Sequence, residues 1–185
     1  MNLLPRDTGW IEVICGSMFS GKTQELIRRL KLAAIARQKV KVFNSALDVR
    51  YSRDHIVSHD KNKIPSQAVP RARDILKHVG ADISVVGIDE VQFFDIEVIA
   101  VCEELARSGK RVIVAGLDQD YKGQPFDITA KLLALSEFVT KNLAICISCG
   151  NPANKSQRLS HSRKRIEVGA SDKYEARCRR CFKPE

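Results

Sequence analysis

The chain has 185 residues, carries a formal net charge of +9, and contains 44% hydrophobic and 29% charged residues. A chain of this length buries roughly 70% of its unfolded surface, so it can fold without a disulfide scaffold, and its composition excludes wholesale disorder. No apolar run approaches ~18 residues, which excludes a membrane-spanning helix. The first ten residues, MNLLPRDTGW, contain no apolar signal segment, so we expect a cytoplasmic protein with no membrane partner.

The first part of the chain predicts a strand, a helix and a second strand. Residues 10–15 (WIEVIC) form a short apolar run before Gly16, which indicates a buried strand. Residues 22–37 carry apolar side chains at helical spacing, and residues 40–43 (VKVF) predict the next strand. Residues 45–70 are polar and show no clear period, so we expect a long loop of the kind that is usually functional or disordered.

Strand and helix signals continue to alternate through the middle of the chain. Residues 83–89 (ISVVGID) form a near-continuous apolar run, which is typical of a strand covered on both faces of a parallel sheet. Further helices are predicted at residues 96–107 and 128–135, and further strands at residues 111–117 and 139–147. This alternation predicts an α/β fold with a mainly parallel sheet flanked by helices.

The pattern changes after Cys146, where Gly, Asn, Ser and basic residues replace the apolar runs. Residues 150–185 hold ten Lys/Arg and four Asp/Glu, and 10 − 4 = +6 of the total +9 lies there. We therefore expect two domains, an α/β domain at residues 1–145 and a small C-terminal domain at residues 146–185. The basic segment alone is compatible with nucleic acid, a phosphorylated ligand or an ordinary solvated surface.

The strongest single motif is GSMFSGKT, which matches G-x-x-x-x-G-K-[ST] between a predicted strand and a predicted helix. Its glycines allow the backbone to bend so that several amide N–H groups point at phosphate oxygens. The N-terminus of the following helix adds partial positive charge from the helix dipole. Lys22 supplies a cation for the β- and γ-phosphates of ATP, and the Thr23 hydroxyl can bind Mg²⁺. A chance glycine turn is the alternative, but it seldom has this context. The predicted nucleotide site comprises Gly16, Ser17, Met18, Phe19, Ser20, Gly21, Lys22 and Thr23.

Two consecutive acids follow the apolar run of residues 83–89. Asp89 ends the predicted strand, where a Walker B carboxylate holds Mg²⁺ directly or through water. Glu90 comes next, at the edge of the sheet where ligands bind, and can take a proton from an attacking hydroxyl or water. The alternative is that Glu90 only caps or solvates the strand end. Beside a P-loop motif we favour the catalytic interpretation.

Four of the six cysteines form two C-x-x-C pairs. Cys146 and Cys149 make the first pair and Cys178 and Cys181 the second, with 28 residues between them. Four thiolates in two pairs suit tetrahedral Zn²⁺, and a site with four protein ligands has no open position. We therefore predict a structural zinc at the base of a long loop. A redox C-x-x-C is the alternative, but the presence of two pairs favours metal.

Together these motifs resemble the thymidine kinases of the zinc-containing, RecA-like type. The resemblance runs from about residue 9 to residue 181 and is carried, in the family's order, by GSMFSGKT, DVRYS, IDEVQFF, LDQDYKGQPF, both C-x-x-C pairs and VGASDKY. It implies that residues 1–145 form a P-loop, ATP-binding domain. Residues 146–185 would form a zinc-bound domain whose spacer, the lasso, lies over the nucleoside.

The resemblance also implies the reaction, which is transfer of the γ-phosphoryl group of ATP to the 5′-hydroxyl of thymidine or deoxyuridine in nucleotide salvage. Lys22 and Arg50 would contact phosphate, Asp89 would serve the metal, and Glu90 would be the base. The nucleoside would contact Phe94, Leu117, Tyr121, Phe126, Ser156, Val168, Gly169 and Tyr174. Position 121 is Tyr where family members often have Phe, and position 156 is Ser where Thr is common. The family is typically a homotetramer inhibited by thymidine triphosphate.

Two other functions remain open from the sequence. A nucleic-acid-binding ATPase with a zinc ribbon would explain the P-loop, the basic segment and the zinc. The chain shows no second basic face with interleaved aromatic residues, so we expect no nucleic-acid partner. A kinase for another deoxynucleoside would have the same fold. Stimulation of ATP hydrolysis by single-stranded DNA would identify the first alternative, and a panel of nucleosides would identify the second.

Overall fold

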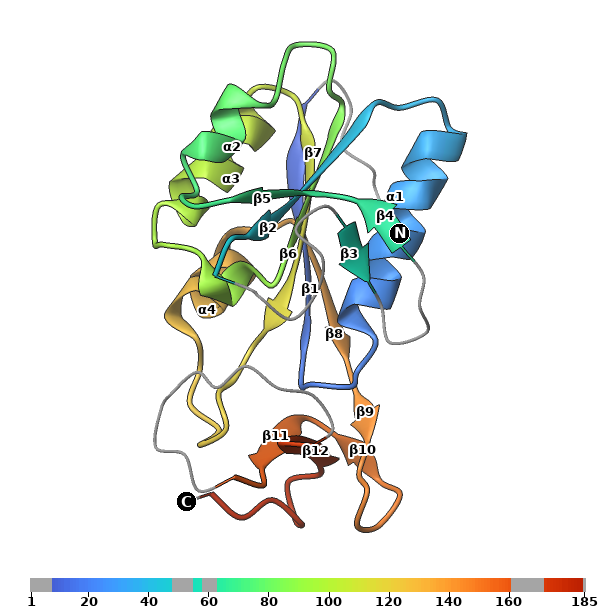
Figure 1. Cartoon of the computed structure of the whole chain (residues 1–185), viewed down its shortest axis with the longest axis vertical. Helices are drawn as coiled ribbons and strands as arrows, with labels where there is room; N and C mark the ends of the chain where they lie inside the picture. Colours follow the sequence, from blue (N-terminus) through green and yellow to red (C-terminus); the bar gives the residue numbers. More distant parts are fainter. Residues whose placement is uncertain (1–7, 48–54, 58–62, 161–171, 185) are drawn as a thin grey trace.

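A six-stranded sheet forms the centre of the computed structural model, which describes residues 8–47, 55–57, 63–160 and 172–184 (Figure 1). Its strands are β1 (Trp10–Gly16), β2 (Val40–Ser45), β5 (Gln67–Val69), β6 (Val85–Asp89), β7 (Arg111–Leu117) and β8 (Phe138–Asn142). Their order across the sheet is β5-β2-β6-β7-β1-β8, and every neighbouring pair is parallel. The carboxyl ends of all these strands therefore lie at one edge.

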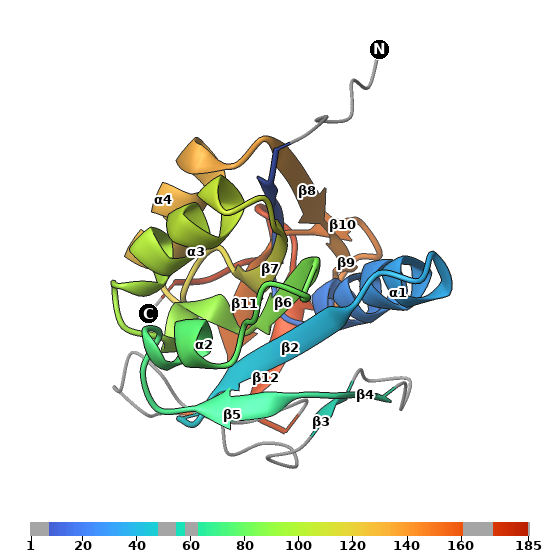
Figure 2. The ribbon, with the colours of Figure 1, turned by 90° about the horizontal axis from the view of Figure 1, so that it is seen from above.

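Helices cover both faces of this sheet (Figure 2). One face carries α1 (Lys22–Ile35). The other face carries α2 (Asp74–Lys77), α3 (Val98–Arg107) and α4 (Asp127–Leu135), together with the short 3₁₀ helix η1 (Val91–Phe93). In the described part of the chain, no helix has the length and apolar character needed to cross a bilayer.

Alternate residues of β7 face two different hydrophobic cores. Val112 and Val114 lie in the core on the α3 side, whereas Ile113 and Ala115 lie in the core on the α1 side. Successive side chains of a strand point to opposite faces, so a strand covered on both faces needs apolar residues at nearly every position. This requirement explains why the central strands have continuous apolar runs in the sequence.

A small C-terminal unit lies against the carboxyl-end edge of the sheet, near the turn from β1 to α1 (Figure 1). It consists of two antiparallel pairs of short strands. The first pair is β9 (Ala144–Ile145) with β10 (Pro152–Ala153), and the second is β11 (Lys155–Arg158) with β12 (Tyr174–Arg177). The predicted fold class is confirmed, since the sheet is parallel, helices flank it, and a cysteine cluster follows it.

The structure corrects the prediction of a continuous loop at residues 45–70. β5 lies within it and extends the main sheet beside β2. A second short pair, β3 (His55–Val57) with β4 (Lys63–Pro65), also lies there. Strands of three residues are too short to show a two-residue period, and β5 forms because the exposed edge of β2 offers unpaired backbone groups.

Two further sequence predictions need adjustment. α2 was not predicted, because its four residues form little more than one turn, too few to show a helical period. The strand predicted at residues 139–147 is two strands, β8 and β9, with a break at Leu143. β8 belongs to the main sheet whereas β9 belongs to the C-terminal unit, so a single apolar stretch connects the two parts of the molecule.

Candidate active site and metal centre

The GSMFSGKT segment forms the turn between β1 and α1 and brings backbone to the edge of the sheet. Gly16 has φ of 144°, and a Cβ built on it would lie 2.2 Å from the carbonyl oxygen of Asn142. Gly21 is left-handed, with φ of 78°, and precedes the first residue of α1. Both positions need glycine, the first for space and the second for conformation. The turn therefore has the backbone freedom that a phosphate-binding loop requires.

Lys22 lies within this loop instead of extending into solvent. Its side-chain Nζ donates a hydrogen bond of 2.7 Å to the carbonyl oxygen of Ser17, and the residue is 8% exposed. The Ser20 hydroxyl donates to the same carbonyl at 2.8 Å. A buried cation in the first residue of a helix favours a polyanionic ligand such as the phosphates of ATP.

Thr23 and Asp89 meet across the sheet edge although 66 residues separate them. The Thr23 hydroxyl donates to the Asp89 carboxylate, at 3.1 Å from Oδ2 and 3.3 Å from Oδ1. Burial, together with the negative charge of Glu90, raises the pKa of Asp89 to about 7. A hydroxyl and a carboxylate are the oxygen donors that Mg²⁺ prefers, and a cation there would stabilise the charged carboxylate. The two residues thus fit the predicted metal.

Glu90 follows β6 in a left-handed backbone conformation, with φ of 49° and ψ of 46°. Such a conformation is uncommon for residues other than glycine and is frequent at functional sites. Its carboxylate accepts a hydrogen bond of 2.5 Å from the side-chain amide of Gln92. Gln92 was not assigned a role from the sequence. The sequence feature that could have identified Gln92 is a polar amide residue within VQFF, the otherwise apolar segment that follows Asp89 and Glu90.

Tyr121 and Tyr174 come from distant parts of the chain and meet on Arg158. The guanidinium carbon of Arg158 lies 3.5 Å from the Tyr121 ring centroid and 5.4 Å from that of Tyr174. Arg158 Nη2 also donates to the Tyr174 hydroxyl at 2.8 Å. All three side chains are buried. The sequence assigns Arg158 no role in the site, because an arginine in the basic spacer between the cysteine pairs can equally be an ordinary loop residue.

The other described residues of the predicted nucleoside site lie at strand and helix ends around the same edge. Leu117 ends β7, and its N–H donates to the Gln92 side chain at 2.9 Å. Phe126 precedes α4 and is buried. Phe94 follows η1 and packs in the core on the α3 side, so its ring also contributes to the hydrophobic core. Arg50, Val168 and Gly169 lie outside the described residues.

Ser156 links the C-terminal unit to the phosphate-binding loop. Its hydroxyl accepts a hydrogen bond of 3.0 Å from the backbone N–H of Met18. Beside it, the Ser17 hydroxyl donates to the carbonyl of Ala153 at 3.4 Å. The sequence had placed Ser156 on the base of the nucleoside. A hydroxyl that accepts one bond can still donate its own proton, so the observed contact is compatible with that role.

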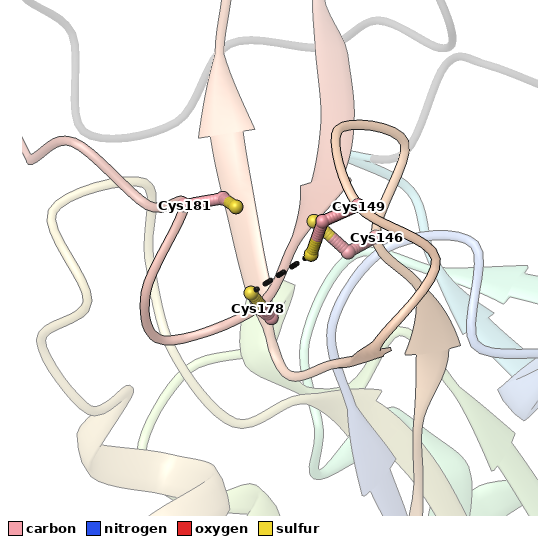
Figure 3. A group of neighbouring side chains, drawn as sticks. All are labelled: Cys146, Cys149, Cys178 and Cys181. Carbon is pink, nitrogen blue, oxygen red and sulfur yellow. Dashed lines mark hydrogen bonds between the residues drawn. The ribbon is translucent and has the colours of Figure 1, made fainter.

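Figure 3 shows the four predicted zinc ligands, with their sulfur atoms pointing toward one another. The four Sγ atoms lie within 4.8 Å of one another, and Cys149 Sγ lies 3.6 Å from Cys178 Sγ. Tetrahedral zinc with bonds of ~2.3 Å needs sulfur atoms about 3.8 Å apart. The backbone N–H of Asn151 is the main cause that lowers the pKa of Cys149 to about 6, which favours the thiolate form that metals bind. The cluster is therefore compatible with zinc.

The sequence is similar to known proteins over nearly the whole chain. The sequence model of a family described as "Thymidine kinase" matches residues 9–182. A thymidine kinase of Rhodothermus sp. (strain ITI 518) is 57% identical over 176 residues, covering 95% of this chain and 82% of that protein. Domain III of the Thermotoga maritima replication initiation protein DnaA aligns with a TM-score of 0.44 and 15% identity, over 71% of this chain and 54% of that one. That structural likeness is too low to support a conclusion.

Proposed function

The chain belongs to the thymidine kinase family, and we propose that it transfers the γ-phosphoryl group of ATP to the 5′-hydroxyl of thymidine at the carboxyl-end edge of its sheet. The observation that supports this site best is the convergence of Thr23, Asp89 and Glu90 beside the phosphate-binding loop. Phosphoryl transfer requires mainly positioning and charge stabilisation, and this edge supplies groups for both.

Each group at this edge has a separate role in the proposal. Lys22 contacts the β- and γ-phosphates, and Arg50, outside the described residues, contacts phosphate charge. Thr23 and Asp89 would hold Mg²⁺, which would neutralise charge on the phosphates. Glu90 accepts the proton of the 5′-hydroxyl as that oxygen attacks the γ-phosphorus. The backbone amides from Gly16 to Thr23 orient the phosphates.

The nucleoside lies between this edge and the C-terminal unit. Tyr121 and Tyr174 enclose it with Phe94, Leu117, Phe126, Ser156, Val168 and Gly169. The contact of both tyrosines with Arg158 supports this arrangement, because it brings two distant segments to one place. The lasso excludes water, which would otherwise compete with thymidine as the acceptor. Deoxyuridine, which lacks only the thymine methyl group, is also accepted.

Zinc held by Cys146, Cys149, Cys178 and Cys181 has a structural role, because a site with four thiolates has no position for substrate. It closes the base of the lasso. Under this proposal, residues 1–145 form the ATP-binding domain and residues 146–185 the lasso domain. The Met18–Ser156 hydrogen bond then joins the two domains at the phosphate-binding loop.

The finer biological assignments follow from the family. We propose a cytoplasmic homotetramer that acts in nucleotide salvage and is inhibited by thymidine triphosphate. The triphosphate would place its base in the nucleoside site and its phosphates toward Lys22. Inhibition kinetics test this, since competition with both thymidine and ATP is expected. If millimolar thymidine triphosphate does not inhibit the enzyme, the proposed regulation is wrong, whereas the proposed catalytic activity is unaffected.

The decisive test of the activity is a panel of nucleosides with ATP and Mg²⁺. The ratio of kcat/KM for thymidine over deoxycytidine should exceed about 10². Cytosine has a hydrogen-bond acceptor at N3, where thymine has a donor. Each buried polar group that is left unpaired by this change costs about 1–3 kcal/mol of binding free energy. Loss of the thymine methyl in deoxyuridine should matter less, and purine nucleosides should fail by size. A kcat/KM ratio of less than tenfold would show that the enzyme does not discriminate thymine from cytosine by these hydrogen bonds.

A further inference from the structure

Gln92 holds the proposed base through a chain of two hydrogen bonds that ends on the backbone. It lies in η1, two residues after Glu90, and is 5% exposed. Its Nε2 donates to Glu90 Oε2 at 2.5 Å, and its Oε1 accepts from the N–H of Leu117 at 2.9 Å. The amide thus connects the turn after β6 to the end of β7.

The orientation of this amide is determined by its partner on β7. A backbone N–H can only donate, so the side-chain oxygen must face Leu117 and the NH₂ group must face Glu90. Leu117 ends β7 and pairs there with Gly16 of β1, whereas the pairing of β7 with β6 stops at Val114. The pairing with β1 fixes the Leu117 backbone, and its N–H donates to Gln92. The donor that faces the carboxylate is therefore fixed by the sheet itself.

Gly116 provides the space that this arrangement needs. A Cβ at that position would lie 2.7 Å from Gln92 Oε1 and 2.7 Å from Val91 Cγ1. Its own backbone does not require glycine by conformation, since its φ is not in the left-handed region. Because Gly116 has no side chain, β7 leaves the space that the Gln92 amide occupies.

We propose that Gln92 is a positioning residue that holds the Glu90 carboxylate in the orientation needed to accept the proton of the substrate hydroxyl. The inference rests on the proposed function, in which Glu90 is the base. A glutamate side chain has three rotatable bonds, and ordering it in advance removes an entropic cost from the transition state. Displacement of a reacting group by about 1 Å can cost 10²-fold in rate.

The alternative is that Gln92 only satisfies the Leu117 N–H and stabilises the sheet edge. Gln92→Glu separates the two roles, because it keeps an acceptor for Leu117 and replaces the donor that faces Glu90 with a second acceptor. Gln92→Met removes both bonds at similar volume. Should Gln92→Met fail to fold, Gln92→Glu keeps the test decisive.

The experiment measures kcat and KM for both variants in the zinc-loaded enzyme, each in the wild-type and the Glu90→Gln background. We expect kcat to fall about 10- to 100-fold, with the KM for thymidine and for ATP within threefold. In the Glu90→Gln background, neither variant should reduce kcat by more than about twofold, because the base on which Gln92 acts is already absent.

Two outcomes would overturn the inference and leave Glu90 as the proposed base. The first is a folded Gln92→Glu enzyme with kcat within twofold of wild type. The second is an equal loss in both backgrounds, which would indicate a structural role. A Glu90→Gln enzyme that keeps most of its turnover is a distinct result, since it removes the base from the proposed function and the Gln92 assignment with it.

Discussion

The Asp89 carboxyl lies almost out of solvent between the Thr23 hydroxyl and a second acid, Glu90. Burial disfavours the charged form of this carboxyl, and the negative charge of Glu90 adds to the effect, so the pKa of Asp89 is raised. Close by, the Lys22 ammonium is folded onto the carbonyl of Ser17. These groups occupy positions that a metal and phosphates would stabilise. At the scale of single residues, the site is therefore arranged for charged ligands.

Glu90→Gln is the sharpest residue-scale prediction. The substitution preserves shape but removes the proton acceptor, so kcat should fall about 10²- to 10⁴-fold. ATP binding should be unchanged, because Lys22, Thr23 and Asp89 remain. Single-turnover kinetics and ATP titration measure the two effects separately. A decrease of less than tenfold, with the chemical step shown to be rate-limiting, would contradict the role of Glu90.

A second residue-scale prediction concerns the ring of Tyr121, which lies against the Arg158 guanidinium at 3.5 Å from its centroid. Tyr121→Phe keeps the ring and should change the KM for thymidine by less than about twofold. Tyr121→Leu removes a cation–π contact of about 0.5–2 kcal/mol, which should raise that KM roughly 2- to 30-fold. The KM for ATP is the internal control. A large effect of Tyr121→Phe would show that the hydroxyl, not the ring, makes the contact.

At the scale of elements, α1 is held in place by charged contacts as well as by its apolar face. Arg29 on α1 pairs with Glu12 of β1 at 2.8 Å, and Glu12 also accepts from Arg111 of β7 at 2.6 Å. Glu25, in the first turn of α1, pairs with both Arg28 and Arg29. This network lies between the helix that follows the phosphate-binding loop and two strands of the sheet. It helps to fix the direction in which the N-terminus of α1 points.

The element-scale prediction is a pH dependence at Glu25. Hydrogen bonding to Arg28 is the main cause that lowers the pKa of Glu25 from 4.5 to about 2. A lowered pKa means that the stabilisation is complete above about pH 4.5 and is lost as pH falls toward 2. Glu25→Gln should therefore unfold at a lower temperature than wild type near neutral pH, by an amount equivalent to about 0.5 kcal/mol for partly exposed pairs.

Thermal unfolding of wild type and Glu25→Gln at several pH values measures this difference. It should shrink below about pH 4.5, and high salt should also reduce it, because exposed ion pairs are screened. A difference that stays constant from neutral pH to the acid range would show that the carboxylate charge contributes nothing to stability.

On the scale of the whole molecule, two parts of very different construction meet at one edge. The α/β part has large apolar cores on both faces of its sheet. The C-terminal unit has a core of a few alanines and cysteines. So small a core stabilises little by burial, and units of this size usually require a metal or disulfides. We infer that the geometry of the nucleoside site depends on the cysteine cluster.

Cys178→Ser tests this dependence. The variant should lose zinc, and its kcat/KM for thymidine should fall by at least tenfold, whereas the affinity for ATP should change little. Cys102→Ala is the matched control, because Cys102 is buried in α3, away from the cluster, and its loss should leave the zinc content unchanged. Full zinc occupancy in Cys178→Ser, or unchanged thymidine kinetics, would contradict this view of the C-terminal unit.

Local patterns in the amino-acid sequence were sufficient to predict several features of this protein. The strand at Arg111–Leu117, the phosphate-binding turn and the two cysteine pairs could all be predicted, because periodicity and motif spacing report on neighbouring residues. The folded structure was needed to establish the order of the strands, the addition of β5, and the contacts of Gln92 and Arg158. These depend on pairing and burial between segments far apart in the chain, and a local sequence pattern contains no information about which distant backbone or ring a side chain will meet.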